Sequence, residues 1–298
     1  MGSPKTGTGY PHFIQPHFVP QLLERPYMAR RSRRNSLNSK KIIGLLVVVL
    51  IALVVNYFSD RQPQERIENI GIELAIPKFT KATESQTIEH IGYTVSYNQG
   101  RRNPNWVAYE LTADEVEGEE PRNGDFIPDP DIRGHQAVDN DYKKSGWDRG
   151  HMAPAGDMKW SEQAMKESFY LSNIAPQNNN LNRGVWKSIE ELARDVAKRY
   201  NNVLVVTGPV FETEKGKGHI GDNKVVIPNA FYKVLLVNDF GYKGIGFYCE
   251  NKAGKKKLAT YARSIDEIED ITGIDFFHKL PDEIEEKMEK EFDWSVWE

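Results

Sequence analysis

The chain has 298 residues, of which 39% are hydrophobic and 28% are charged, and its net charge is −4. This composition excludes a fully disordered chain, a protein with many membrane spans and a collagen-like repeat, and the length suffices for one large domain or two small ones. The single cysteine, Cys249, excludes an internal disulfide, a four-cysteine zinc site and a CxxC redox pair.

The net charge hides a strong asymmetry along the chain. Residues 1–61 hold nine Lys and Arg against two acids, a net charge of +7. Residues 265–298 hold thirteen acids against three lysines, a net charge of −10. The part between them is close to neutral. The basic head, the neutral body and the acidic tail would each attract different partners, so the overall charge is a poor guide to what the chain binds.

The head, residues 1–41, contains five prolines and little hydrophobic periodicity, which predicts a disordered cytoplasmic segment. An almost unbroken apolar run follows over residues 42–58, and as a helix its 17 residues would span roughly 25 Å. We expect this run to be a transmembrane anchor. The basic residues before it place the N-terminus in the cytoplasm and the body on the extracytoplasmic side, periplasmic or cell-envelope. A cleaved signal peptide is the alternative, but no small-residue cleavage site follows the run.

The body is predicted to consist of a polar stem over residues 59–90 and a folded domain over residues 91–298. Runs rich in Val and aromatic side chains predict strands at 93–97, 106–111, 203–206, 224–227, 231–237 and 245–249. Helical periodicity predicts helices at 161–169, at 185–200 and in the acidic tail after its N-cap, Ser264. Because strands outnumber helices and lie too close for crossover helices, we expect an α+β domain with a largely antiparallel sheet.

One region of the domain carries three motifs of unusual composition. DRGHMAP occupies residues 148–154, LSNIAPQ occupies 171–177, and LNRGVW occupies 181–186, at the start of a predicted helix. That helix then carries Glu190 and Arg194. A histidine, several arginines, two asparagines and a glutamate are thereby gathered around one loop followed by one helix.

These residue types suit the cleavage of a phosphodiester. A histidine such as His151 can take a proton from water near neutral pH, and arginines can neutralise charge on a phosphate. Asparagine and glutamate offer hard oxygen ligands to Mg2+, which keeps most of its waters. Asn182 is near a helix N-terminus and Glu190 follows eight residues later, so both can flank one site. Arg194 follows Glu190 by four residues, on the same helix face.

The same residues also have purely structural interpretations. Asn182 alone can be a helix cap, and Glu190 with Arg194 can be a surface ion pair. A second R-G-H sequence occurs at 133–135, so a match of three residues is weak evidence by itself. That second copy lacks the preceding Asp and the downstream pair of asparagines, so the whole constellation, and not the short motif, carries the inference.

Taken together, the three motifs resemble the DNA/RNA non-specific endonucleases of the ββα-metal class, the family of Serratia-type nuclease and mitochondrial endonuclease G. The motifs occur in the family's order and spacing, and the resemblance extends over about residues 93–277. It implies a ββα-metal nuclease core that hydrolyses phosphodiester bonds of DNA and RNA. It also implies 5′-phosphate and 3′-hydroxyl products and Mg2+, or Mn2+, as the cofactor.

The resemblance implies roles for three residues in the chemical step. His151 would be the general base that activates the attacking water. Asn182 would be the direct protein ligand of a hydrated Mg2+ ion, and Glu190 would reach the metal through a water molecule. The ion would stabilise the charge of the phosphorane and of the leaving 3′ oxygen.

Other residues would contact the substrate or hold the site in place. The resemblance implies that Arg149 and Arg194 contact the scissile phosphate or its developing charge. Asn173 would orient the general base or the phosphate, and Arg122 is a further candidate for a phosphate contact. Asp148 would brace the motif loop as a structural group. The metal site, the base and these contacts form the candidate active site.

Other functions and one other location remain open. A non-catalytic nucleic-acid-binding module would keep the fold without hydrolysis, and a different metal phosphodiesterase would act on small nucleotides. The Arg-rich, acid-poor head would also suit a mitochondrial targeting sequence, although the long apolar run fits an anchor better. The expected partners are DNA, RNA and, through residues 42–58, a membrane. A homodimer, an inhibitor protein and a preference between DNA and RNA stay undecided.

Overall fold

The structure is a computed structural model that describes residues 43–44, 46–52, 71–254 and 257–298. The chain divides into two compact units, Met1–Arg61 and Gln62–Glu298. In the first unit the described residues are helical and exposed. The second unit contains every strand that the described residues form, together with the three sequence motifs.

The predicted transmembrane anchor, residues 42–58, is only partly covered by the described residues. Residues 42, 45 and 53–58 lie outside them, and the predicted head, residues 1–41, lies outside entirely. Within the described ranges, no helix combines the length and the apolar character that a membrane crossing requires. The described residues therefore give the predicted anchor no support.

A seven-stranded sheet forms the centre of the second unit, and all of its neighbouring strands are antiparallel. The expected α+β architecture with a largely antiparallel sheet is thereby confirmed. In spatial order the strands are β12 (Ala262–Arg263), β11 (Tyr242–Glu250), β10 (Ala230–Asn238), β7 (Asn202–Val210), β4 (Asn103–Thr112), β3 (Thr94–Asn98) and β2 (Gln86–Glu89). The predicted strand at 224–227 lies outside this sheet, where β9 (Val225–Val226) pairs with β8 (His219–Ile220).

Helices and short turns alternate with the strands along the chain. The helices are α2 (Ala113–Val116), α3 (Asp139–Tyr142), α4 (Glu162–Glu167), α5 (Asn179–Leu181), α6 (Lys187–Tyr200), α7 (Ile265–Thr272) and α8 (Asp282–Lys290). The turns are the 3₁₀ turns η1 (Ile72–Leu74), η2 (Ala155–Asp157), η3 (Leu171–Asn173), η5 (Leu258–Thr260) and η6 (Trp294–Val296), and the π-helical turn η4 (Asn182–Trp186).

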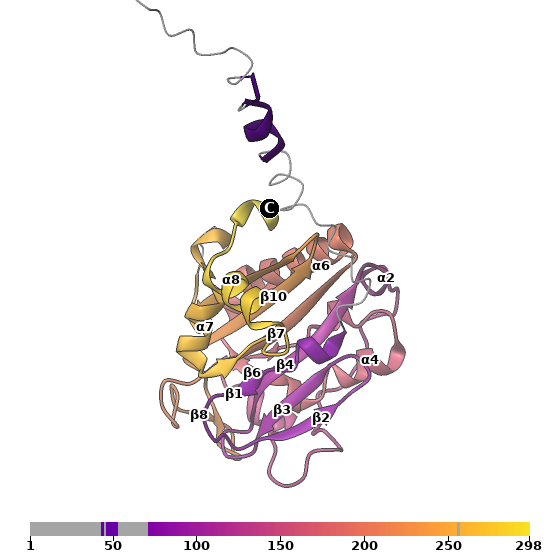
Figure 1. The fold of residues 1–298 in the computed structure, drawn as a ribbon. Coiled ribbons are helices and arrows are strands. Elements are labelled where there is room, and N and C mark those ends of the chain that lie inside the picture. Colours follow the sequence, from indigo (N-terminus) through magenta and orange to yellow (C-terminus); the bar gives the residue numbers. More distant parts are fainter. Residues whose placement is uncertain (1–42, 45, 53–70, 255–256) are drawn as a thin grey trace, which may run out of the picture. The chain divides into compact units, whose positions relative to one another are not determined.

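Each face of the large sheet packs against its own hydrophobic core. Val205 and Phe231 lie in the core that also contains Ile189 of α6. Val206 and Val234 lie in the other core, with residues of α7 and α8. Figure 1 shows α7 and α8 on one side of the sheet and α6 on the other. Because successive residues of a strand point to opposite faces, β7 and β10 are buried at every position.

The predicted helices start where the sequence indicated, but the acidic tail is not one helix. The Ser264 hydroxyl accepts a hydrogen bond from the Glu267 amide, and the Glu267 carboxylate accepts one from the Ser264 amide. This reciprocal cap begins α7. Gly273 ends the helix in the left-handed region, with φ at +66°. The chain then forms β13 (Ile274–Asp275) before α8 begins.

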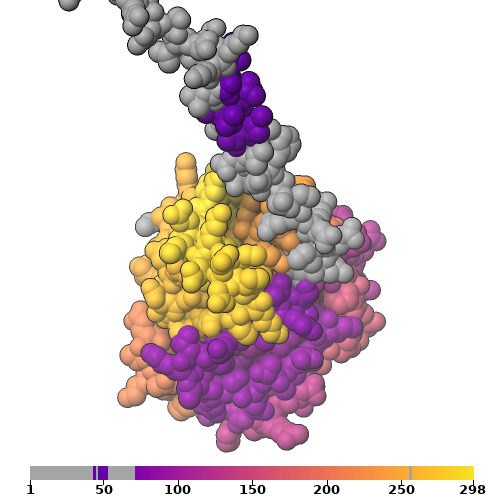
Figure 2. Space-filling view, in the orientation of Figure 1, coloured from indigo at the N-terminus to yellow at the C-terminus, as the bar shows by residue number. Residues whose placement is uncertain are grey.

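Part of the predicted stem, residues 71–90, is folded. Strand β1 (Lys78–Phe79) pairs with β13, and β2 is an edge strand of the large sheet. The residues of β2 alternate between half-buried and exposed, so the strand has too few buried side chains to give a strong sequence signal. Figure 2 shows this early part of the unit, in purple, beside the yellow C-terminal residues on the surface.

The first two motifs pair as strands, where the sequence suggested a loop. β5 (Asp148–His151) and β6 (Ile174–Gln177) form an antiparallel ladder outside the large sheet. Charged residues and glycine dominate β5, which explains why no strand was predicted there. The ladder is followed directly by α5, η4 and α6, so the motifs together form two strands and a helix.

Candidate active site

The ladder between β5 and β6 fixes the position of the motif residues. Asp148 pairs with Gln177, and His151 pairs with Ile174. Gly150 lies in β5 between Asp148 and His151, and a Cβ atom added to it would lie only 2.6 Å from the Cβ of Gln177. Glycine therefore fits this close approach where any larger residue would force the strands apart. The ladder holds Asp148 at one end of β5 and His151 at the other.

The imidazole of His151 is buried but lines a cleft. Only 8% of the residue is exposed, and the rings of Phe126 and Phe169 lie 5.5 Å and 5.2 Å from it, measured between centroids. Its Nε2 atom has no hydrogen-bond partner among the described residues. Burial, followed by the positive charge of Arg122, lowers the pKa of His151 to about 3. The ring is therefore neutral at neutral pH, and one of its nitrogens can accept a proton.

The main chain at His151 is held from three directions. Trp186 Nε1 donates to the carbonyl oxygen of His151 at 3.4 Å, and Lys233 Nζ donates to that of Met152 at 3.3 Å. The Met152 amide in turn donates to the carbonyl oxygen of Asn173 at 3.0 Å. These partners come from η4, β10 and η3, so three elements distant in sequence position the histidine.

Asn173 lies behind the histidine loop and does not line the cleft. Its Oδ1 accepts from the Ala153 amide at 2.9 Å, and its Nδ2 donates to the carbonyl oxygens of Ala153 and Ser168, both at 2.8 Å. The side chain is fully buried. Asn173 thus ties Met152 and Ala153, the two residues after His151, to the end of α4.

Asp148 gathers three polar side chains at the beginning of the motif helix. Its carboxylate accepts from Asn182 Nδ2 at 3.1 Å, from Arg183 Nε and Nη2 at 2.9 Å each, and from Asn179. Burial alone would raise the pKa of Asp148, but these hydrogen bonds hold it below the ordinary value. Because Asn182 Nδ2 is bound to Asp148, the amide is fixed in one orientation. Its Oδ1 has no hydrogen-bond partner among the described residues.

Glu190 and Arg194 lie one turn apart on α6 and differ in their partners. Arg194 Nη1 donates to Asp157 Oδ1 at 2.6 Å, and Asp157 also accepts from the Tyr109 hydroxyl at 2.8 Å. Glu190 is half-buried, and the described residues offer it neither a hydrogen bond nor an ion pair. Burial raises the pKa of Glu190, while the charge of Lys233 opposes the increase. Arg194 is thus held in place, whereas the Glu190 carboxylate has free oxygens.

Lys233 is a fully buried cation beneath the cleft. Its Nζ lies 5.0 Å from the ring centroid of Trp186 and 5.9 Å from that of Tyr109. Burial lowers the pKa of Lys233, and the negative charges of Glu190 and Asp157 oppose this decrease. A lysine in the layer between the sheet and α6 therefore balances part of the charge of two carboxylates.

Two arginines line the cleft beside the histidine. Arg149 Nη2 lies 2.5 Å from Asp139 Oδ1 and also donates to the Asp139 carbonyl oxygen at 2.9 Å. Its guanidinium is 5.3 Å from the ring centroid of Phe126. Arg122 is exposed, with its guanidinium 5.1 Å from the ring centroid of Phe169. Arg149 is thus anchored, and Arg122 extends over the ring that also packs against the histidine.

Most of the predicted site residues meet in one cleft of about 480 Å³. Its charged and polar lining comprises Arg122, Arg149, His151, Asn182, Arg183, Lys187, Glu190 and Arg194. Five of these side chains are basic and one is acidic, so the cleft attracts anions although the whole chain has a net charge of −4. Asp148 and Asn173 are the predicted residues outside this lining, and each supports it from behind.

The donor atoms of the cleft fit a small, hard cation. The amide oxygen of Asn182 and the carboxylate of Glu190 are both free of hydrogen bonds within the described residues and both line the cleft. Mg2+ and Mn2+ prefer such oxygen ligands, with water in the remaining positions. The residues present therefore suit the metal that the motifs imply.

Three residues of the site had not been identified from the sequence. Lys233 had one available signal, because it interrupts the apolar run 230–237 and such a position in a strand is buried. Asp157 and Tyr109 had no signal, since their role depends on contacts between β4, η2 and α6. Side chains that support a site from distant elements are visible only in three dimensions.

Comparison with known families places this fold and site. The model of the DNA/RNA non-specific endonuclease family matches residues 71–283. The chain belongs to the DNA/RNA non-specific endonuclease family. Both strands of the ladder, the motif helix and the whole cleft lie within the matched residues. The family resemblance inferred from the motifs is confirmed.

Individual relatives agree with this assignment. The chain is 37% identical over 214 residues to the mitochondrial nuclease EXOG of Xenopus laevis, a match covering 66% of this chain and 60% of the relative. It is 39% identical over 159 residues to human mitochondrial endonuclease G, covering 50% and 54%. A solved structure from the EndoG/EndoGI complex superimposes with a TM-score of 0.64 at 30% identity, covering 72% of this chain and 92% of that one. The matches span 56% to 64% of the length of the EXOG relatives.

Proposed function

We propose that the chain is a metal-dependent endonuclease that hydrolyses phosphodiester bonds in DNA and RNA without regard to the sugar. One observation carries the proposal. A neutral, buried histidine opens onto a cleft that also holds five basic side chains and two side chains, Asn182 and Glu190, whose oxygen atoms accept no hydrogen bond from the described residues. The basic residues suit a polyanion, the histidine suits a proton acceptor, and the oxygens suit a divalent cation.

The residues of the cleft have different roles in the proposed reaction. His151 takes a proton from the attacking water at a ring nitrogen, which is available because the ring is neutral. Arg149 and Arg194 are each held by a carboxylate, so they present fixed positive charge to the scissile phosphate. Arg122, which is exposed at the cleft, supplies a further phosphate contact.

Asn182 and Glu190 would hold the cation, Mg2+ or Mn2+, with Asn182 as the direct ligand and Glu190 acting through water. When bound, the ion neutralises charge that develops on the phosphate and on the leaving 3′ oxygen. Asp148 keeps the Asn182 amide oxygen directed into the cleft. The expected products have 5′-phosphate and 3′-hydroxyl ends.

The test compares cleavage of supercoiled plasmid and of RNA by the full chain in Mg2+ or in EDTA. His151→Ala is the test variant. The matched control is His135→Ala, because His135 follows the same Arg-Gly pair but is exposed and lies outside the cleft. We expect Mg2+-dependent nicking of both substrates by the wild type and by His135→Ala. Removal of the general base should lower the rate by about 10²- to 10⁴-fold.

The two other functions would give distinct results. A well-folded protein that binds nucleic acid but cleaves nothing under any divalent metal would show a binding module. Hydrolysis of a small chromogenic diester without nicking of plasmid would show a phosphodiesterase for small nucleotides. Either outcome would overturn the endonuclease proposal.

We further propose a mitochondrial location. The EXOG and endonuclease G relatives carry that location in their names, and the first 41 residues are rich in arginine and poor in acids. Fusion of residues 1–61 to a fluorescent protein tests this proposal. We expect the fusion to enter mitochondria, and to lose that location when the arginines at 30, 31, 33 and 34 become glutamine. Accumulation at another membrane would favour the anchor at residues 42–58.

A further inference from the structure

Two clusters of possible metal ligands lie outside the cleft. Within the described part of the chain, the first consists of His90, Asp129 and Asp131, and the second of Asp266, Glu269 and Glu289. In each cluster the ligand atoms lie within 4.8 Å of one another. The clusters differ in whether hydrogen bonds already occupy those atoms, and this difference decides which of them has room for a cation.

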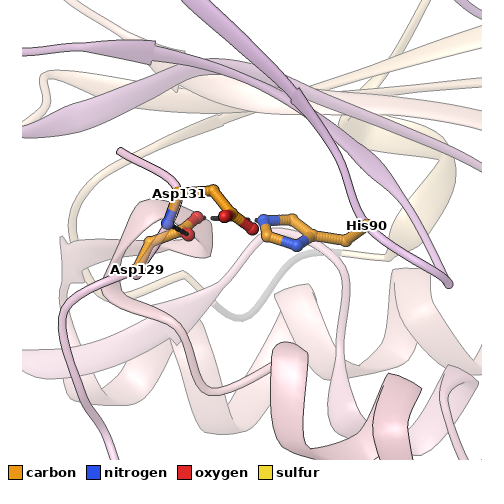
Figure 3. Close-up of side chains that lie close together, drawn as sticks. All are labelled: His90, Asp129 and Asp131. Atoms are coloured by element: carbon orange, nitrogen blue, oxygen red, sulfur yellow. Dashed lines mark hydrogen bonds and ion pairs between the residues drawn. The ribbon is translucent and has the colours of Figure 1, made fainter. Parts of the chain in front are cut away.

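The first cluster is already satisfied by protein groups. Figure 3 shows the His90 ring directed at the two aspartates. Asp129 Oδ2 accepts from His90 Nε2 at 2.9 Å and from the Ser172 hydroxyl at 2.5 Å, and its Oδ1 accepts from the Asp131 amide at 3.0 Å. Burial alone would raise the pKa of Asp129, but His90 and Ser172 hold it below the ordinary value. The carboxylate is thus a structural junction with no need of a metal.

The second cluster lies between two helices on the sheet face opposite α6. Ile265 of α7 and Met288 of α8 both reach the sheet at Gly244, where they are the nearest side chains to the position of a Cβ. Asp266 and Glu269 are three residues apart, on one face of α7, and they meet Glu289 of α8. The packing of both helices on β11 therefore brings the three carboxylates together.

No basic side chain of the described residues pairs with this second cluster. Glu289 is only 6% exposed, and its Oε1 has no hydrogen-bond partner in the described residues. Among those same residues, no lysine or arginine forms an ion pair with any of the three acids. Burial and the charge of Glu269, followed by those of Glu285 and Asp266, raise the pKa of Glu289 to about 9.

Leaving a buried carboxylate oxygen without a partner beside other carboxylates is costly. A hydrogen bond from the Phe276 amide, at 2.7 Å, reaches Glu269 Oε1, whereas Glu289 Oε1 receives none from the described residues. Two kinds of positive particle can relieve the repulsion, a shared proton or a metal cation. Three carboxylates on two helices can supply up to six oxygens, which suits a cation of high and variable coordination number.

We propose that Asp266, Glu269 and Glu289 form a Ca2+-binding site that joins α7 to α8, separate from the cleft. Ca2+ is the ion indicated because all the ligands are carboxylates and their geometry comes from two helix faces without a rigid cage. The site would stabilise the C-terminal part of the unit. It does not depend on the proposed endonuclease function.

The test uses the full chain carrying Asn182→Ala, which removes the proposed metal ligand of the cleft and leaves the second site intact. Calorimetric titration with CaCl2 and thermal unfolding with and without CaCl2 are the measurements. Glu289→Gln is the test variant, because an amide of the same shape replaces a carboxylate that could bind the cation. Glu283→Gln on the exposed side of α8 is the matched control.

We expect the Asn182→Ala protein, with or without Glu283→Gln, to bind one Ca2+ per chain and to unfold at a higher temperature in its presence. Adding Glu289→Gln should weaken Ca2+ binding at least tenfold and abolish the temperature increase. Without Ca2+, the same substitution should raise the unfolding temperature, because the amide, unlike the buried carboxylate, needs no proton to fold. The increase would also show that the variant is folded.

Two results would overturn the site. One is the absence of Ca2+ binding by the Asn182→Ala protein, which would leave a shared proton as the stabilising particle. The other is Ca2+ binding that survives Glu289→Gln unchanged, which would place the ion elsewhere. Neither result bears on cleavage of nucleic acid, so failure of this site and failure of the endonuclease proposal are distinguishable.

Discussion

Asp148 provides no cleft surface, yet it determines what Asn182 can offer. An amide has a donor end and an acceptor end, and a carboxylate can only bind the donor end. The 3.1 Å hydrogen bond from Asn182 Nδ2 to Asp148 therefore selects the orientation in which the amide oxygen is free. Ligand orientation of this kind, set from behind the metal ligand, usually matters nearly as much as the ligand itself.

We therefore expect Asp148→Ala to weaken Mg2+ binding, so that cleavage needs an Mg2+ concentration about 10- to 100-fold higher. The measurement is the Mg2+ concentration that gives half-maximal nicking of plasmid. Arg183→Ala is the control, because it removes both hydrogen bonds from Arg183 to Asp148 and keeps the one from Asn182. An unchanged Mg2+ requirement in Asp148→Ala would contradict this orienting role.

His151 leads to a prediction about pH. Burial disfavours the charged ring and lowers the pKa of His151 to about 3, whereas in the unfolded chain its pKa is about 6.5. Protonation therefore favours the unfolded state, and the contribution of His151 to the free energy of unfolding falls as the pH drops from about 6.5 towards 3. Above that range the contribution is constant.

The measurement is the NMR signal of the His151 ring, assigned with His151→Asn, in a titration of the metal-free protein. Between pH 8 and pH 5 we expect no change in the chemical shift that a protonation would cause. A titration with its midpoint near about 6.5 would mean that the ring is exposed to water and would remove the reason for its neutrality.

At the scale of elements, the β5–β6 ladder has no room for a larger residue at Gly150. Gly150→Ala would insert a Cβ against Gln177, so we expect the free energy of unfolding to fall by about 1–3 kcal/mol, as for other overpacked positions. Urea unfolding measures the loss. Gly71→Ala is the control, since a Cβ there meets nothing within 4 Å. Equal stability of the two variants would show that the ladder can open without cost.

Some elements of the fold could be predicted from the sequence and others could not. The long strands and α6 were predictable because they bury most of their residues and repeat with a regular period. β5 and β2 were not, because one is rich in charge and glycine and the other is an edge strand with few buried side chains. Both of these strands depend on a partner distant in the sequence, or on an edge position, rather than on local pattern.

The candidate site follows the same division. His151, Asn182 and Glu190 were identifiable because a motif and helical spacing place them together, and the cleft contains all three. Asn173 was expected to orient the general base or the phosphate, which left its partners open. The structure shows its side chain bound to the main chain of Ala153 and Ser168. Asp157 and the hydrogen-bond partner of Lys233 became apparent only from the packing of the sheet against α6.

At the scale of the molecule, the division into two compact units predicts that the second folds by itself. The fragment 62–298 contains the whole sheet, both hydrophobic cores and the cleft. We expect it to unfold in one cooperative transition and to retain Mg2+-dependent cleavage at the rate of the full chain. Circular dichroism during heating and the plasmid assay are the measurements. A non-cooperative transition would mean that residues 1–61 are part of the fold.

Lys233 also has a consequence for how the strands find their register. In β10 the neighbours Tyr232 and Val234 point into the core that α7 and α8 cover, whereas Lys233 points towards α6 and the cleft. A slip of β10 by one residue would exchange these faces and place the ammonium group in an apolar layer, far from the Met152 carbonyl oxygen. An apolar residue at this position would tolerate either pairing. The charge beneath the cleft therefore also penalises misfolded strand pairings, so one side chain both supports the cleft and fixes the register of the sheet.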